Sequence, residues 1–268
     1  MAICAMMCGF DTWSEITLFA QEREPWFRRW LSLPGGIPSH DTFNRIFATL
    51  PPASLKSIFQ AWIGDIMGDD KLVGQLAVDG KALRATAKGR GANAVHMVNV
   101  WSTELGMCVG QQKVADKSNE ITAIPELLQL LELKGCLVSI DAMGTQVKIA
   151  DTILKKSGDY LLAVKDNQPS LNTEVKEQFQ AYWDKNETDV SGHGFTEQFD
   201  SEHGRKEHRR CWVLVVDESM PVCQQWKAKT IIAVQAERIE NGKGYDFVRF
   251  YISSRALDAT SALKATRA

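Results

Sequence analysis

Hydrophobic residues in the first quarter of the chain recur every three or four positions, the spacing that places them on one face of a helix. Breaks rich in proline and glycine at 34–36 and 51–52 divide this region, and Ser39 is a suitable N-cap for the helix after it. We therefore predict an N-terminal helical region over residues 1–70, with its apolar stripes as core. The stripes comprise Trp13, Ile16, Leu18 and Phe19; Trp26, Phe27, Trp30 and Leu31; and Phe43, Ile46, Phe47 and Leu50.

From Gly74 onward the pattern changes to short apolar runs typical of strands. Two of these runs, 94–102 and 108–114, flank the segment Glu104-Leu105-Gly106, which indicates a hairpin. Strand-like and helix-like segments then alternate, which predicts crossover helices on a mixed or parallel sheet. The predicted elements are strands 74–79, 94–102 and 108–114, helix 120–133, strand 136–141, helix 145–157, strand 160–164 and helix 170–183.

Antiparallel strands followed by βαβ units are the element order of the ribonuclease-H-like fold. The predicted fold class is therefore α/β: a ribonuclease-H-like mixed sheet with flanking helices, over residues 71–268. Within it, residues from about 190 to 253 return to strand patterns between turns rich in glycine and charge, which indicates a β-rich insertion. A last helix is expected to begin near Asp258.

Two aspartates stand at the ends of two predicted buried strands, Asp79 after the run 75–78 and Asp141 after the run 136–140. A carboxylate at the end of a buried strand is costly to desolvate unless it has a partner, and a shared divalent metal is such a partner. Either aspartate alone is more often a turn residue. As a pair in this fold order they are the candidate catalytic and metal-binding residues, with oxygen ligands that suit Mg²⁺ or Mn²⁺.

Composition further limits the kinds of site and of partner that the protein can have. The six cysteines show neither a CxxC pair nor histidines at zinc-ligand spacing, so we expect reduced thiols in a cytoplasmic protein rather than a zinc site or a disulfide framework. The apolar start, residues 1–10, lacks a basic leader and is too short to span a bilayer, so no membrane partner is expected. With a formal net charge of −2, any nucleic-acid surface must be local.

Two local clusters of basic residues are present. One comprises Lys81, Arg84, Lys88 and Arg90, and the other Arg205, Lys206, Arg209 and Arg210 around Glu207. A charge cluster is usually a solvated face, but beside a metal site it can bind DNA phosphates. Lys165, Asn167 and Gln168 follow the predicted strand 160–164, where substrate contact and a structural turn are equally good interpretations. The candidate DNA-binding residues are Lys81, Arg84, Lys88, Lys165, Asn167, Gln168, Arg205 and Arg209.

Several segments closely resemble the H-repeat-associated transposases of bacterial insertion sequences. The segments are 78–84 (VDGKALR), 116–128 (DKSNEITAIPELL), 140–144 (IDAMG), 160–168 (YLLAVKDNQ), 203–205 (HGR) and 251–254 (YISS). The resemblance implies a DDE transposase in which Asp79 and Asp141 are the first two acidic residues. It also implies Mg²⁺ or Mn²⁺ as cofactor and double-stranded DNA, as insertion-sequence ends and target, as partner, and it is compatible with a homo-oligomer.

The resemblance also implies a third acid. Family members have further sequence before the first helix of this chain, and they continue past the segment that matches Arg267 to a glutamate that has no counterpart here. The resemblance therefore implies a chain truncated at both ends and impaired in cleavage. A non-catalytic DNA-binding remnant and an unrelated metal-dependent nuclease of the same fold are the alternatives. Glu207 is the internal candidate for the lost acid, but an exposed strand residue paired with Arg205 or Arg209 is the better interpretation. His203 is most simply a turn residue.

Overall fold

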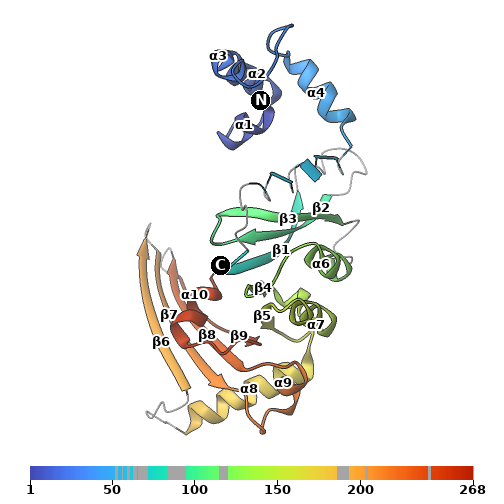
Figure 1. Ribbon diagram of the computed structural model, residues 1–268. Coiled ribbons are helices and arrows are strands. Elements are labelled where there is room, and N and C mark those ends of the chain that lie inside the picture. Colours follow the sequence, from blue (N-terminus) through green and yellow to red (C-terminus); the bar gives the residue numbers. More distant parts are fainter. Residues whose placement is uncertain are drawn as a thin grey trace, which may run out of the picture. The chain divides into compact units, whose positions relative to one another are not determined.

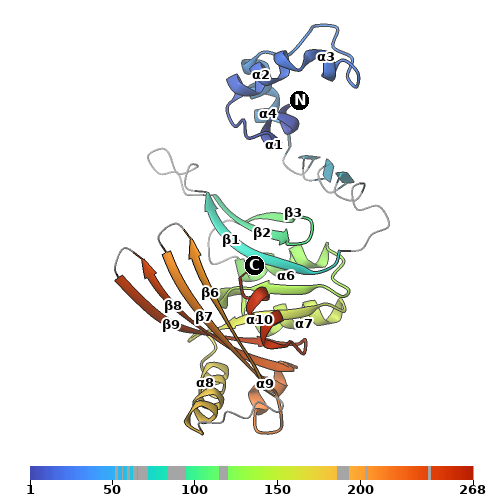
Figure 2. The ribbon, with the colours of Figure 1, turned by 90° about the vertical axis from the view of Figure 1, so that its left-hand side faces the viewer.

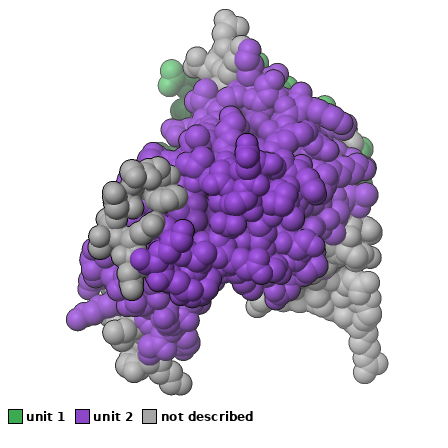
Figure 3. Space-filling model, turned by 90° about the horizontal axis from the view of Figure 1, so that it is seen from below, with its two compact units in different colours: residues 1–66 green, residues 67–268 purple. Residues whose placement is uncertain are grey.

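The structure is a computed structural model that describes residues 1–51, 72–83, 95–114, 120–185, 193–202, 205–240 and 243–267, with scattered positions from 54 to 65. The chain divides into two compact units, Met1–Ile66 and Met67–Ala268 (Figure 3). No helix in the described ranges is long and apolar enough to cross a membrane.

Helices make up the first unit, and side-chain caps begin two of them. The Thr12 hydroxyl accepts a hydrogen bond from the Glu15 N–H, and the Glu15 carboxylate accepts one from the Thr12 N–H, which together form a capping box. Ser39 caps its helix as the sequence predicts, by accepting from the Thr42 N–H. The helices are α1 (Ala2–Met7), α2 (Trp13–Glu22), α3 (Glu24–Phe27) and α4 (His40–Thr49).

Members of the first and third apolar stripes form the core of this unit. Ile16 and Phe43 are buried, and the rings of Trp13 and Phe47 lie 4.9 Å apart. The prediction that the middle stripe is also core is wrong for most of its members, because α3 is about one turn long and only Phe27 faces inward. The exposed members of that stripe are Trp26, Trp30 and Leu31. The prediction is also wrong for Leu18 of the first stripe and Ile46 of the third, which are exposed as well.

A nine-stranded sheet is the framework of the second unit, in the order β3-β2-β1-β4-β5-β9-β8-β7-β6 (Figure 1). β1 pairs antiparallel with β2 and parallel with β4, and β4 pairs parallel with β5. The first five strands thus combine an antiparallel meander with crossover strands, and the predicted ribonuclease-H-like α/β class is confirmed. The strands are β1 (Gln75–Leu83), β2 (Val95–Ser102), β3 (Met107–Val114), β4 (Leu137–Ile140), β5 (Asp159–Val164), β6 (His193–Glu202), β7 (Arg205–Val215), β8 (Thr230–Glu240) and β9 (Lys243–Ser253).

The β-rich segment continues this same sheet. β9 pairs antiparallel with β5, and β8, β7 and β6 follow as an antiparallel meander. The strands are longer than the apolar runs in the sequence. β6 contains no such run, because Phe195 and Phe199 are its only large apolar residues and they do not alternate with polar ones, so periodicity alone misses the strand. The short helix α9 (Pro221–Gln225) between β7 and β8 was also missing from the sequence prediction.

Helices lie on both faces of the sheet. Residues of α6 (Glu120–Gln129), α7 (Val147–Lys155) and α8 (Pro169–Asp184) pack into the larger core on one face, and α10 (Ala259–Ala265) packs on the other (Figures 1 and 2). Successive strand residues point to opposite faces, so each central strand contributes to both layers. The face that carries α10 is called the α10 face below, and the other the α6–α8 face.

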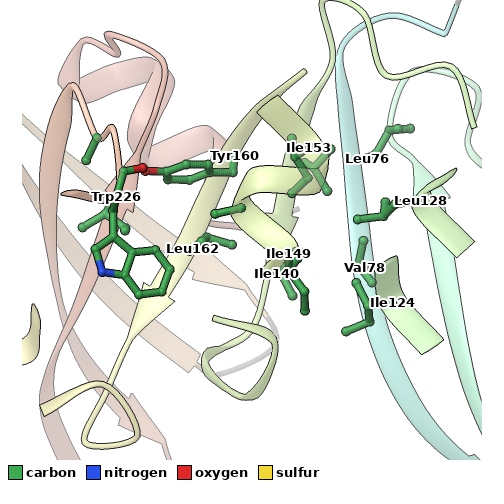
Figure 4. Packing of buried hydrophobic residues seen from close by; sticks show 14 of the residues in the cluster. Leu76, Val78, Ile124, Leu128, Ile140, Ile149, Ile153, Tyr160, Leu162 and Trp226 are labelled. Carbon is green, nitrogen blue, oxygen red and sulfur yellow. The ribbon is translucent and has the colours of Figure 1, made fainter. Parts of the chain in front are cut away.

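The larger core surrounds the middle strands. Val78 of β1, Ile149 of α7 and Leu162 of β5 are buried in it (Figure 4). Tyr160 is also fully buried, and its hydroxyl donates to the Trp226 carbonyl at 2.6 Å. Burial raises the pKa of this hydroxyl, so the side chain stays neutral and able to donate.

An aspartate begins α10. The Asp258 carboxylate accepts hydrogen bonds from the N–H and the hydroxyl of Ser261, at 2.9 and 2.6 Å. These bonds lower the pKa of Asp258 below its ordinary value of 3.8. The ionised cap therefore contributes stability that is fully present above the unfolded-state pKa and is lost as the pH falls through the lower folded-state pKa.

We expect Asp258→Ala to lower the free energy of unfolding at neutral pH by about 1 kcal/mol, the usual cost of losing an N-cap. Asp258→Asn keeps an acceptor and should cost less, but it should lack the part of the acid-induced loss that occurs below about pH 4. Urea unfolding of the three proteins at several pH values, followed by circular dichroism, measures both effects. Equal acid sensitivity of wild type and Asp258→Asn would contradict this account of the cap.

Candidate active site

Neighbouring strands bring the two candidate aspartates to one place. Val78 of β1 and Ile140 of β4 are register partners, and both are buried in the core of the α6–α8 face. The next residues, Asp79 and Asp141, are exposed on the side of α10. Both line one open cavity of about 680 Å³.

The end of α10 also reaches this cavity, where Ala265 and Thr266 line it. One side-chain amide holds the helix there: Gln75 Nε2 donates to the Ala265 carbonyl at 2.7 Å and to Ser139 Oγ at 2.8 Å. Gln75 thus connects the two strands that carry the aspartates with the end of α10.

The two carboxylates differ in their own contacts. Asp141 Oδ1 accepts from the Gly144 N–H at 3.2 Å and begins the short helix η3 (Ala142–Gly144), while its Oδ2 accepts no hydrogen bond from any residue that the structure describes. The backbone of Asp79 pairs with β2, but its carboxylate makes neither a hydrogen bond nor an ion pair with any described residue. Three carboxylate oxygens are therefore available to a ligand in the cavity.

Cations surround the carboxylates. Lys81, Lys165 and Arg249 all line the cavity and are exposed. The Arg249 guanidinium lies 4.9 Å from the centre of the Phe247 ring and close to the Tyr251 hydroxyl. Burial raises the pKa of Tyr251, although the Arg249 guanidinium, which donates to the phenol oxygen, counteracts part of this rise, so the phenol stays neutral at neutral pH.

Arg249 was missed by sequence reasoning. Its signal is the strand alternation that places residues 247, 249 and 251 on one face, but no sequence pattern indicates that β9 pairs with β5. Asn99 and Gln111 were missed as well; they line the cavity, and Gln111 Nε2 donates to Asn99 Oδ1 at 2.8 Å.

Of the other predicted DNA-binding residues, some fall outside the described part of the chain. These are Arg84, Lys88 and the side chain of Arg205. His203, which the sequence indicates to be a turn residue, is also outside the described residues. Lys81 and Lys165 are thus the predicted cations that the structure places beside the aspartates.

Arg209 lies elsewhere and is already paired. Its guanidinium contacts Glu207 at 2.6 Å and Asp200 at 2.7 Å, and its side chain is only 14% exposed. The preferred interpretation of Glu207 as an ion-pair partner is confirmed, although Glu207 is buried, at 8% exposure. Neither residue lines the cavity, so we leave both out of the proposed DNA surface and the proposed metal site.

Asn167 and Gln168 direct their amides toward protein backbone. Asn167 Nδ2 donates to the Ala142 carbonyl at 2.7 Å, and Gln168 Nε2 donates to the Thr145 carbonyl at 2.9 Å. Both acceptors belong to the loop that follows Asp141. These contacts agree with the structural-turn alternative.

The cavity suits a hard divalent cation. Asp79 and Asp141 supply carboxylate oxygens, the ligands that Mg²⁺ and Mn²⁺ favour. Within the described ranges, no group of three or more histidine, cysteine or acidic side chains is placed to hold a metal ion. A metal held by two carboxylates would complete its shell with water and substrate phosphate, which is a usual arrangement for Mg²⁺.

Comparison with known proteins defines the class. Residues 74–259 match the family described as "Transposase DDE domain", and residues 1–63 match the associated family described as "DDE_Tnp_1-associated". The chain belongs to the DDE transposase family.

Two relatives of similar sequence agree with this assignment. The protein of Escherichia coli O157:H7 named "Putative transposase YncI" is 38% identical over 100% of this chain and 69% of its own length. The protein of Escherichia coli K12 named "H repeat-associated putative transposase YhhI" is 38% identical over 100% of this chain and 71% of its own. A synaptic complex of the piggyBac transposase with hairpin DNA aligns at a TM-score of 0.39 and 10% identity, over 92% of this chain and 52% of that one.

Proposed function

We propose that this protein acts in insertion-sequence transposition, by metal-dependent cleavage and joining of double-stranded DNA at the cavity of Asp79 and Asp141. The observation that carries the proposal is the shared cavity: two carboxylates with three oxygens available stand among Lys81, Lys165 and Arg249. An in-line attack on a phosphodiester requires carboxylates that hold a metal ion, with positively charged side chains beside them.

The acidic and the basic residues of the cavity would have different roles. Asp79 and Asp141 would hold Mg²⁺ or Mn²⁺, which supplies a water of lowered pKa and positive charge beside the leaving oxygen. Lys81, Lys165 and Arg249 would bind the phosphates on either side of the reacting one. The free cysteines support a reducing, cytoplasmic location. Joining DNA ends brings several strands together, so we further propose that the working form is a homo-oligomer.

A second candidate function is DNA binding without catalysis. The observation that favours it is that the described residues bring two acids, not three, to the cavity. We propose that a polypeptide of these 268 residues cleaves DNA slowly at most, because two carboxylates neutralise a metal pair incompletely. Incubation with supercoiled and oligonucleotide DNA in Mg²⁺ or Mn²⁺ tests this. Joined products would indicate a transposase, hydrolysis alone a nuclease of the same fold, and rapid cleavage would contradict the proposed impairment.

DNA affinity should depend on the cations of the cavity. We expect Lys165→Ala combined with Arg249→Ala to weaken duplex binding and to reduce the slope of log K against log salt by about two units, since each phosphate contact contributes about 0.9. Fluorescence anisotropy across a series of salt concentrations measures both quantities.

The matched control removes two lysines from α7, on the α6–α8 face of the sheet. Lys148 and Lys155 are exposed on α7, away from the cavity, and their replacement by alanine changes the net charge by the same amount. This pair should leave the slope nearly unchanged. Equal slopes for the two double variants would mean that binding follows net charge, and the proposed surface would be wrong.

A further inference from the structure

The turn between β5 and α8 holds the loop that follows Asp141. The amides of Asn167 and Gln168 donate to the carbonyls of Ala142 and Thr145 in this loop. We propose that Asn167 and Gln168 are positioning residues that set the direction of the Asp141 carboxylate, and with it the affinity of the site for a divalent metal. This inference rests on the proposed function, because it takes Asp141 to be a metal ligand.

The direction of the carboxylate depends on this loop because Asp141 begins it. Asp141 Oδ1 accepts from the Gly144 N–H, so a movement of Gly144 turns the side chain and its available Oδ2. Thr145 anchors the far end, where its hydroxyl donates to the Ala163 carbonyl of β5 at 2.6 Å. β5 and the turn after it therefore hold both ends of the loop.

The surrounding core leaves the loop little room to settle elsewhere. Ala142 and Thr145 are buried, and a Cβ added to Gly144 would clash with Ile140. The carbonyls of Ala142 and Thr145 cannot turn to water unless these buried residues move. Loss of the Gln168 amide would leave the Thr145 carbonyl without its side-chain donor, and loss of the Asn167 amide would leave the Ala142 carbonyl only its 3.2 Å bond from the Thr145 N–H. Either loss would favour loop conformations in which Asp141 points differently.

Direct contact with DNA is the competing interpretation, since Lys165 of the same turn lines the cavity. The two roles predict different results. A residue that contacts DNA lowers DNA affinity even without metal when it is replaced. A positioning residue lowers metal affinity, as outer partners of metal ligands do, and leaves metal-free DNA binding unchanged.

The test replaces each donor by an apolar side chain of similar volume, in Asn167→Leu and Gln168→Met. Ser170→Ala, at an exposed position in the first turn of α8, is the matched control. In the metal-free protein we expect amide exchange at Gly144, followed by NMR, to accelerate about fivefold to tenfold in both donor variants and not in the control. We expect their affinity for Mn²⁺ to fall by about tenfold to a hundredfold, and duplex binding in EDTA to stay within about twofold of wild type.

Unchanged exchange at Gly144 in the donor variants would overturn the proposal. Faster exchange with unchanged Mn²⁺ affinity would also overturn it, as would weaker DNA binding in EDTA. If Asn167→Leu fails to fold, Gln168→Met decides by the same criteria. Wild-type protein that binds no Mn²⁺ would overturn the proposed metal site and the metal role of the turn together, whereas the exchange data would still report separately whether the turn holds the loop.

Discussion

Asparagine in place of Asp79 or of Asp141 is expected to weaken Mn²⁺ binding by about a hundredfold or more. Loss of an outer partner of a metal ligand costs about tenfold to a hundredfold, and a direct ligand contributes negative charge as well as orientation. Asparagine at position 79 should leave the fold intact, because the Asp79 carboxylate makes no hydrogen bond or ion pair with any described residue and the backbone pairing with β2 stays possible. Isothermal titration with Mn²⁺ measures the affinity.

The rate of DNA cleavage should depend on the same two aspartates. Any metal-dependent cleavage should fall by about a hundredfold or more in either variant, the usual effect of removing a group that stabilises charge in the transition state. Gel assays of nicked DNA over time measure this rate. An extended polypeptide with a third acid should cleave faster, and the same two substitutions should abolish that gain.

The controls separate this site from general effects of charge. Asp184→Asn removes a carboxylate from α8 on the other face of the sheet, keeps an acceptor for Gln180, and should leave Mn²⁺ affinity unchanged. Glu207→Gln tests the one internal candidate for a third acid and should also leave it unchanged, since Glu207 pairs with Arg209 away from the cavity. A loss in either control equal to that in Asp79→Asn would refute the site.

The largest expected effect on stability comes from the core beneath the site. We expect Leu162→Ala to lower the free energy of unfolding by about 3 kcal/mol, within the range of roughly 2–5 kcal/mol for a buried leucine. Leu162 is fully buried at the centre of β5, in the same cluster as Ile149 and Ile153 of α7 (Figure 4). A cavity there cannot close easily, because strands on both sides hold β5 in register.

Chemical denaturation followed by tryptophan fluorescence measures this loss. Leu130→Ala is the control, since Leu130 is 60% exposed and its truncation should cost less than about 0.5 kcal/mol. Similar losses for the two leucines would mean that the cluster around Leu162 is not the core of the second unit.

Local periodicity was sufficient for much of this fold. The Ser39 cap, the hairpin around Gly106 and the order of strands and helices from β1 to α8 follow from spacing within short windows, which each segment carries in its own sequence. The position of Asp79 and Asp141 after two apolar runs was visible for the same reason. Their presence in one cavity required more, namely the pairing of β1 with β4.

The sequence by itself thus determined the element order from β1 to α8, the fold class and the two carboxylates, because these depend on apolar runs and helical spacing within single segments. Only the tertiary structure decided that Arg249 joins the site through the pairing of β9 with β5. It also decided that Asn167 and Gln168 turn toward the Asp141 loop. These outcomes depend on contacts between segments far apart in the chain, which no local pattern encodes.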